Sequence, residues 1–296
     1  MTPGAEERRS PGWPSGRSRV VGVIGDPIRH SLSPLLHNAA FDAMGLDWVS
    51  VAFEVPAGAG PAALAGMRAL GIAGLSVTMP HKEDAARTVD RCSPDAERLG
   101  AVNCVTLEGG ELVGDSTDGP GFLDALASGP GFDPGGHRCV VVGAGGAARA
   151  VILALAGAGA AEVVVLNRDG ARAAAAAGLA GERGRVGSPA DLAGGELVVQ
   201  ATPVGMAGVG SDGPHGVHPL VDPAVLHRDQ LVVDIVYHPA RTPLLVRAEA
   251  AGARTANGLG MLVHQAAHAV RRWTGQDVPV SAMWETANRA LADRQP

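Results

Sequence analysis

A glycine-rich turn near the middle of the chain constrains the fold more than any other feature of the sequence. An apolar run at 139–142 leads into Gly143-x-Gly145-x-x-Ala148, and an alanine-rich segment follows. This order of strand, tight turn and helix is the dinucleotide-binding fingerprint, with alanine at its third small position. Backbone N–H groups at such a helix N-terminus favour a pyrophosphate, and small residues let it approach. Because a domain's length of sequence precedes the turn, we expect a substrate domain first and a cofactor domain second.

The bulk composition indicates a globular chain and argues against several classes of protein. The 296 residues are 46% hydrophobic, which is enough for a sizeable core in one or two domains. The formal net charge of −6 argues against a nucleic-acid-binding surface. No apolar run is long enough to span a bilayer, and the N-terminus lacks the apolar core of a signal peptide. Cys92, Cys104 and Cys139 have no disulfide or metal-binding spacing, so we expect a reducing, cytoplasmic location and three small buried side chains.

Glycine and proline divide the first half of the chain into short strands and helices. Residues 1–17, which are rich in glycine, proline and charge, are predicted to form a disordered tail. Beyond the tail we expect strands at 19–24, 48–55 and 72–77, helices at 33–44, 62–70, 82–89 and 94–99, and a β-hairpin at 102–107 and 111–114. Ser33 before Pro34 predicts an N-cap followed by proline at the first helical position. A helix that starts near residue 120 is expected to lead out of the first domain.

The second half alternates strands and helices, a rhythm that predicts a mostly parallel sheet covered on both faces. We expect strands at 139–142, 162–166, 197–200, 231–235 and 254–255, and helices at 147–156, 172–179, 261–273 and 281–292. The predicted fold class is α/β, with an N-terminal α/β substrate domain, a Rossmann-like dinucleotide-binding domain, and C-terminal helices that pack back on the first domain. We place the substrate domain at 18–120, completed by 259–296, and the cofactor domain at 121–258.

Polar residues in the first half supply candidate chemistry. Ser31 and Ser33 stand at a helix start, where two hydroxyls and the helix N-terminus suit a carboxylate, although Ser33 taken alone fits a simple helix cap better. Lys82 follows a strand end closely enough to reach a cleft between domains, although a lone lysine is usually a solvated surface residue. Asn103 offers a side-chain amide. Asp118 offers a carboxylate in a tight polar turn, where turn formation alone would also explain it.

The end of the second strand of the cofactor domain bears on the choice of nicotinamide cofactor. An acid at this place bonds the ribose 2′-hydroxyl of NAD, whereas an arginine accepts the 2′-phosphate of NADP. The chain has both, in Asn167-Arg168-Asp169. The guanidinium of Arg168 suits a phosphate, so we predict NADP. Asp169 keeps NAD as the alternative, unless its side chain only caps the next helix.

Together, these motifs resemble the shikimate dehydrogenase family over nearly the whole chain, from Val20 to Trp284. The matching strings are Gly25-Asp26-Pro27-Ile28-x-His30-Ser31-x-Ser33-Pro34 with His37-Asn38, Val77-Thr78-Met79-Pro80-His81-Lys82, Ala101-Val102-Asn103, Thr117-Asp118-Gly119-x-Gly121-Phe122, Gly143-Ala144-Gly145-Gly146-Ala147, Asn167-Arg168, Ala201-Thr202-Pro203-Val204-Gly205-Met206, Asp234-Ile235-Val236-Tyr237-x-Pro239, and Asn257-Gly258-Leu259-Gly260-Met261-Leu262 with Gln265. So many matches in the same order make the resemblance specific.

The resemblance implies a reaction, a small-molecule substrate and a site, in a chain that acts as a monomer or homodimer. The reaction is reversible hydride transfer between NADPH and the ring ketone of 3-dehydroshikimate, which yields shikimate, with Lys82 and Asp118 as the catalytic pair. The residues that would bind the substrate carboxylate and ring hydroxyls are Ser31, Ser33, Thr78, Asn103, Asp118, Tyr237 and Gln265. The residues that would bind the cofactor are Gly143, Ala144, Gly145, Gly146, Ala147, Asn167, Arg168, Thr202, Val204, Met206, Ile235, Gly258 and Met261. No metal is implied, and His215-x-x-His218 is interpreted as part of a glycine-rich loop.

Three departures from the family pattern leave alternatives open. Many members have asparagine where this chain has Ser76 and Ser116, and threonine where it has Asp169. These differences keep open an NAD-dependent quinate, shikimate or aminoshikimate dehydrogenase. The other alternative is a ligand-sensing protein on the same fold, although the presence of both Lys82 and Asp118 argues against it.

Overall fold

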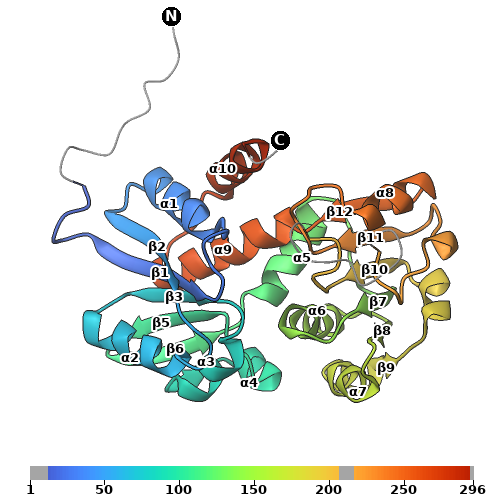
Figure 1. Ribbon diagram of the computed structural model, residues 1–296, viewed down its shortest axis with the longest axis horizontal. Helices are drawn as coiled ribbons and strands as arrows, with labels where there is room; N and C mark the ends of the chain where they lie inside the picture. Colours follow the sequence, from blue (N-terminus) through green and yellow to red (C-terminus); the bar gives the residue numbers. More distant parts are fainter. Residues whose placement is uncertain (1–12, 207–216, 294–296) are drawn as a thin grey trace, which may run out of the picture.

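Two β-sheets, one in each lobe of the molecule, organise the described part of the chain (Figure 1). The computed structural model describes residues 13–206 and 217–293. Most of the predicted N-terminal tail, residues 1–12, lies outside the described residues. Within those two described ranges, no helix has the length and hydropathy that crossing a bilayer requires.

The first sheet is mixed, and its strands run in the order β2-β1-β3-β5-β6-β4. β1 pairs in parallel with β2 and β3, and the predicted hairpin forms the antiparallel pair β5–β6. The strands are β1 (Arg19–Gly25), β2 (Trp48–Glu54), β3 (Gly74–Val77), β4 (Arg91–Cys92), β5 (Cys104–Glu108) and β6 (Glu111–Asp115), and the helices of this lobe are α1 (Ser33–Ala43), α2 (Gly60–Leu70), α3 (Lys82–Thr88) and α4 (Pro94–Leu99). Since β1 and β3 are parallel, the segments that follow them, which carry Ser31 and Thr78, leave the sheet at one edge.

The second sheet is parallel throughout, with the order β12-β11-β10-β7-β8-β9. Its strands are β7 (Arg138–Val142), β8 (Glu162–Leu166), β9 (Gly184–Val186), β10 (Leu197–Gln200), β11 (Leu231–Asp234) and β12 (Arg254–Asn257), and its helices are α6 (Gly146–Gly157), α7 (Gly170–Gly178) and α8 (Pro243–Ala250). The chain winds from β7 to β9 on one side and then crosses to β10 on the other. The strand order therefore reverses between β7 and β10, the place where doubly wound sheets bind ligands.

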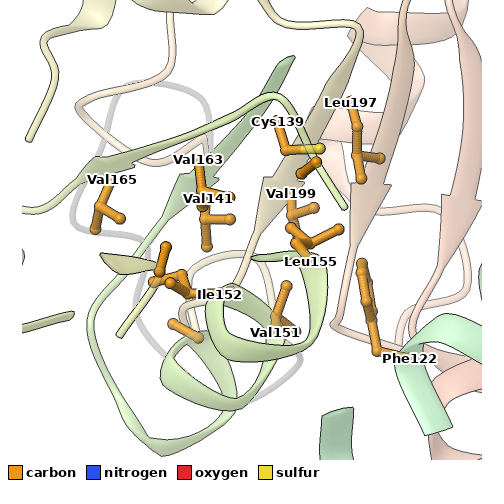
Figure 2. Packing of buried hydrophobic residues seen from close by; sticks show 14 of the residues in the cluster. Phe122, Cys139, Val141, Val151, Ile152, Leu155, Val163, Val165, Leu197 and Val199 are labelled. Atoms are coloured by element: carbon orange, nitrogen blue, oxygen red, sulfur yellow. The ribbon is translucent and has the colours of Figure 1, made fainter. Parts of the chain in front are cut away.

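The core of the second lobe explains why its central strands have consecutive apolar residues, mostly valine. Val141, Val163 and Val199 come from three neighbouring strands and pack against Ile152 and Leu155 of α6 (Figure 2). Alternate residues of the same strands, such as Val140 and Val164, enter a second cluster on the opposite face. A strand that is buried on both faces needs apolar residues at every position, which is the pattern of a parallel sheet.

Two helices join the lobes. α5 (Asp118–Ser128) and α9 (Leu259–Thr274) cross between the sheets, and α10 (Val280–Ala292) lies against α1 (Figure 1). The indole nitrogen of Trp273, near the end of α9, donates to the carbonyl oxygen of Val105 in the first sheet, at 3.1 Å. The expectation that the C-terminal helices pack back on the first lobe is therefore confirmed.

Several elements differ from the sequence-based expectation. α1 begins at Ser33, but its N-cap residue is Leu32 and no side-chain capping bond forms among the described atoms, so the predicted N-cap at Ser33 is wrong. β4, β9 and α8 were not predicted. β4 and β9 are two and three residues long, too short to show a period. Cys104 and Cys139 are buried as expected, whereas Cys92 is only partly buried.

Candidate active site

A cavity of about 270 Å³ lies between the lobes and gathers the polar residues singled out in the sequence. It is lined by all seven predicted substrate-binding residues and by Lys82: Ser31, Ser33, Thr78, Lys82, Asn103, Asp118, Tyr237 and Gln265. They come from the edge of the first sheet, from both crossing helices and from the loop after β11. No single element could supply such a set, so the site depends on the packing of both lobes.

The strongest electrostatic contact in this cavity joins Lys82 and Asp118. Nζ of Lys82, the first residue of α3, lies 2.5 Å from Oδ2 of Asp118, the first residue of α5. The two side chains are only 18% and 10% exposed, so water screens the pair weakly. Placing both residues at helix starts fixes their backbones, which leaves an ammonium group held at the cavity wall.

Asn103 holds the carboxylate from its other side, and Thr117 holds the amide of Asn103. Nδ2 of Asn103 donates to Oδ1 of Asp118 at 2.7 Å, while its Oδ1 accepts from the backbone N–H of Thr117 at 2.7 Å. The backbone carbonyl of Asn103 in turn accepts from the N–H of Val77 at the end of β3, at 2.7 Å. Both oxygens of Asp118 are thus engaged, by Lys82 and by Asn103. The positioning contacts of Thr117 were missed in the sequence, because a threonine before an aspartate in a turn has no pattern that reveals its partner.

Ser31 and Ser33 bring two hydroxyl groups to the N-terminus of α1. Ser33 is 7% exposed, and its backbone N–H donates to Oγ of Ser31 at 3.2 Å. Because Ser33 stands inside the helix rather than at its cap, its hydroxyl is not used to cap α1 and lines the cavity. Two hydroxyls and an eleven-residue helix pointing its N-terminus at one place suit a carboxylate.

A second cavity, of about 530 Å³, adjoins the first and reaches the glycine-rich turn. The two cavities share Thr78, Lys82, Met206, Ile235 and Tyr237. The larger one is also lined by Gly145, Gly146, Ala147 and Thr202. A ligand that filled both would pass Lys82 at their junction.

The glycine-rich turn fits a dinucleotide such as NADP. Gly143 has a φ of +124°, and a Cβ there would come within 2.9 Å of the carbonyl oxygen of Ala201. A Cβ at Gly145 would meet none of the described atoms within 4 Å, so the space above the turn is open to a ligand. Gly145 is also the N-cap of α6, and no side chain of the described chain caps this helix. The first N–H groups of α6 therefore remain available for phosphate oxygens.

Asp169 caps the next helix. Its Oδ1 accepts from the backbone N–H groups of Ala171 and Arg172, at 2.9 and 3.1 Å, at the start of α7. Nδ2 of Asn167 donates to the carbonyl oxygen of Asp169 at 3.0 Å, which shapes the same turn. Arg168 is exposed. The capping interpretation of Asp169 is confirmed, because its Oδ1 caps α7.

Several predicted cofactor residues line neither cavity in the part of the chain that the structure describes. These are Gly143, Ala144, Asn167, Arg168 and Val204, whereas Gly258 and Met261 line the smaller cavity. Met79, 64% exposed, and His30 line both cavities, although the sequence favours a structural role for His30 and assigns Met79 none.

Among the described residues, no group of three histidine, cysteine or acidic side chains is arranged to hold a metal ion. Of the two histidines in His215-x-x-His218, whose spacing resembles that of metal ligands, His215 lies outside the described residues. His218 is buried, and its Nδ1 accepts from the N–H of Leu220 at 3.1 Å, which is a structural role.

Comparison with known proteins shows the family of this chain. Residues 23–105 match the shikimate dehydrogenase substrate-binding domain, and residues 258–287 match the shikimate 5′-dehydrogenase C-terminal domain. A shikimate dehydrogenase (NADP(+)) of Methanopyrus kandleri is 46% identical over 90% of this chain and 94% of its own length. A crystal structure of a shikimate dehydrogenase with NADP+ superimposes with a TM-score of 0.86, at 36% identity, over 94% of this chain and 97% of that one. The structure of a Thermus thermophilus shikimate 5-dehydrogenase with NADP(H) and shikimate superimposes with a TM-score of 0.85. The two chains are 39% identical, and the match covers 92% of this chain and 100% of that one. The chain therefore belongs to the shikimate dehydrogenase family.

Proposed function

We propose that this protein is an oxidoreductase that reversibly reduces 3-dehydroshikimate to shikimate with NADPH. The observation that carries the proposal is the Lys82–Asp118 pair, held at the junction of a polar cavity and a cavity that ends at the dinucleotide turn. The relatives named as NADP-dependent shikimate dehydrogenases over nearly the full chain support the same reaction.

The proposed substrate roles are those that the resemblance to the shikimate dehydrogenase family implies, and the chemistry of each group fits them. Ser31, Ser33 and the N-terminus of α1 bind the carboxylate, with help from Tyr237. The residues that bond ring hydroxyls are Thr78, Asn103, Asp118 and Gln265. We assign the substrate domain to 18–120 completed by 259–296, and the cofactor domain to 121–258.

Lys82 supplies the proton chemistry of the proposed reaction. The bound nicotinamide supplies or accepts the hydride. As negative charge grows on the substrate's carbonyl oxygen, the ammonium of Lys82 stabilises it and donates a proton. Asp118 holds Lys82 in place and accepts a hydrogen bond from the neighbouring ring hydroxyl. Low exposure of both side chains strengthens these interactions relative to water.

NADP is the proposed cofactor. Gly145, Gly146 and Ala147 at the start of α6 would hold the pyrophosphate, and Arg168 with Asn167 would hold the ribose phosphate. The carboxylate of Asp169 already accepts two backbone N–H groups of α7, which supports this choice over NAD.

Initial rates measured with shikimate and with quinate, each with NADP+ and with NAD+, test the proposal. We expect the highest kcat/KM for shikimate with NADP+. A preference for quinate with NAD+ would replace the proposed function by the quinate dehydrogenase alternative. Absence of any NADPH consumption with 3-dehydroshikimate would favour a ligand-sensing protein.

We infer that the protein acts in the aromatic amino-acid pathway, in the cytoplasm, as a monomer or homodimer. The pathway follows from the proposed substrate, and the cytoplasmic setting from the need for NADPH and from three cysteines in no disulfide bond.

A further inference from the structure

Two buried polar side chains lie at the C-terminal ends of neighbouring strands in the second sheet, and neither takes part in the proposed chemistry. Gln200 is the last residue of β10 and Asp234 is the last residue of β11, and the two are directly paired in the sheet register. Each is 1% exposed. Buried polar groups at the ends of parallel strands cost free energy unless they are bonded, so their partners indicate what they do.

The amide of Gln200 organises the loop that follows β10. Its Oε1 accepts from the backbone N–H and from Oγ1 of Thr202, both at 2.6 Å. Its Nε2 donates to the carbonyl oxygens of Thr202 and Val204, both at 3.0 Å. One side chain thus bonds Thr202 and Val204 of the segment that carries Thr202 and Met206 to the larger cavity.

The carboxylate of Asp234 organises the segment that follows β11. Its Oδ1 accepts from the backbone N–H of Val236 at 3.1 Å, and its Oδ2 accepts from Oγ1 of Thr242 at 2.6 Å. Thr242 also caps α8, so the segment is anchored at both ends. This segment carries Ile235 and Tyr237 to the cavities.

Gln200 and Asp234 are also joined to each other. Nε2 of Gln200 lies 3.3 Å from Oδ1 of Asp234, and the backbone carbonyl of Gln200 accepts from the N–H of Ile235 at 3.0 Å. The amide therefore has one orientation, with its oxygen on the N–H of Thr202 and its NH2 on two carbonyls and a carboxylate. The two segments that form one wall of the larger cavity depend on this single group.

We propose that Gln200 is a positioning residue for the dinucleotide, acting through Asp234 and the segments 201–206 and 235–242. It does not line either cavity in the described part of the chain, so its effect on binding is indirect. The identity of the dinucleotide as NADP rests on the proposed function. The positioning role itself requires only that the larger cavity bind a dinucleotide.

The substitution Gln200→Glu tests this role with almost no change of shape. A carboxylate cannot donate a hydrogen bond, so the two backbone carbonyls and the Asp234 carboxylate would lose their donor. The segments that form the cavity wall would then no longer be held in one geometry. We expect the Kd for NADPH, measured by fluorescence titration, and the KM for NADP+ to rise at least about tenfold. The KM for shikimate should rise less than the KM for NADP+, because Tyr237 is the one proposed substrate-binding residue that lies on these segments.

Gln230 supplies a matched control at the opposite end of the same sheet, directly before the first residue of β11. It is also 1% exposed, and its Nε2 donates to the carbonyl oxygens of Leu192 and Gly195, both at 2.7 Å, while its Oε1 accepts from the N–H of His227 at 3.0 Å. Gln230→Glu should lower the midpoint of thermal unfolding as Gln200→Glu does, but leave the Kd for NADPH unchanged. Equal effects of the two substitutions on the Kd would overturn the positioning role.

If Gln200→Glu does not fold, Thr242→Val reaches the same network from Asp234. It keeps the side-chain volume and removes the donor to Oδ2, so the Kd for NADPH should rise, and Thr242→Ser should restore it. A Kd in Thr242→Val equal to that of the wild type would overturn the inference. Wild-type protein that binds NADPH but does not oxidise shikimate would overturn the proposed function while leaving the positioning role standing.

Discussion

At the scale of single residues, the charge on Lys82 is kept in place by two side chains from different elements. Asp118 pairs with the ammonium at 2.5 Å, and Asn103 fixes the carboxylate at 2.7 Å. An ammonium group stabilises a growing negative charge best when it is already in position before the reaction. Asp118 and Asn103 hold the ammonium of Lys82 in such a position.

Lys82→Ala removes the proposed proton donor without removing any substrate-binding group. We expect kcat to fall at least about a hundredfold, while the KM for shikimate changes little, because general acid help is worth about 10²–10⁴ in rate. Steady-state kinetics check this, and a thermal unfolding curve shows whether the variant is folded. Near-normal turnover by folded Lys82→Ala would refute the assignment.

Asp234 makes folding stability depend on pH. Burial raises the pKa of Asp234 to about 6, although hydrogen bonds from Thr242, Val236 and Gln200 oppose the rise. Because the folded pKa lies above the unfolded value of 3.8, the folded state holds the proton more tightly. This contribution to stability is fully present below about pH 4 and is lost as the pH rises through 6.

Asp234→Asn should abolish that dependence, since the amide does not ionise. Between pH 4 and pH 7 the free energy of unfolding of the wild type should fall, relative to this variant, by roughly 2–3 kcal/mol. Urea unfolding at a series of pH values measures the difference. Parallel curves for the two proteins would show that the carboxyl group titrates at its ordinary pKa.

At the scale of elements, the start of α7 decides how Asp169 is interpreted. If Asp169 is only a cap, Asp169→Ala should lower the free energy of unfolding by about 0.5–2 kcal/mol. Asp169→Ser, which keeps a capping oxygen, should retain most of the wild-type stability. The ratio of kcat/KM for NADP+ to that for NAD+ should change less than about fivefold, because the loss of a solvent-exposed charge has only a small electrostatic effect. A larger change would mean that Asp169 contacts the ribose.

The elements also show how far sequence reasoning reaches. The βα rhythm, the hairpin and the motif strings were enough to predict both sheets and to choose seven residues that the structure brings into one cavity. Local rules were insufficient where partners come from far along the chain. The cap of α1 shifted from Ser33 to Leu32, and the buried bonds of Thr117 and Gln200 had no local signal, because a buried amide and an exposed one look alike in a sequence.

At the scale of the whole molecule, the α5–α9 crossing sets the geometry between the lobes. α5 begins at Asp118, and α9 carries Gln265 to the same cavity. Both helices are therefore part of the site as well as of the connection, so a change in their spacing moves two substrate-binding groups together.

Gly121 sets that spacing. A Cβ at Gly121 would come within 2.5 Å of the backbone nitrogen of Gln265, which the main chain of α9 can relieve only by moving. Gly121→Ala should therefore destabilise the protein by about 1–3 kcal/mol and raise the KM for shikimate. Gly157→Ala, at the end of α6, is the control: its Cβ meets no described atom within 4 Å, so stability should be equal or slightly higher. Urea unfolding and steady-state kinetics compare the two. If Gly121→Ala were as stable and as active as Gly157→Ala, the lobes would be able to shift apart without disturbing the site, and the crossing would not set its geometry.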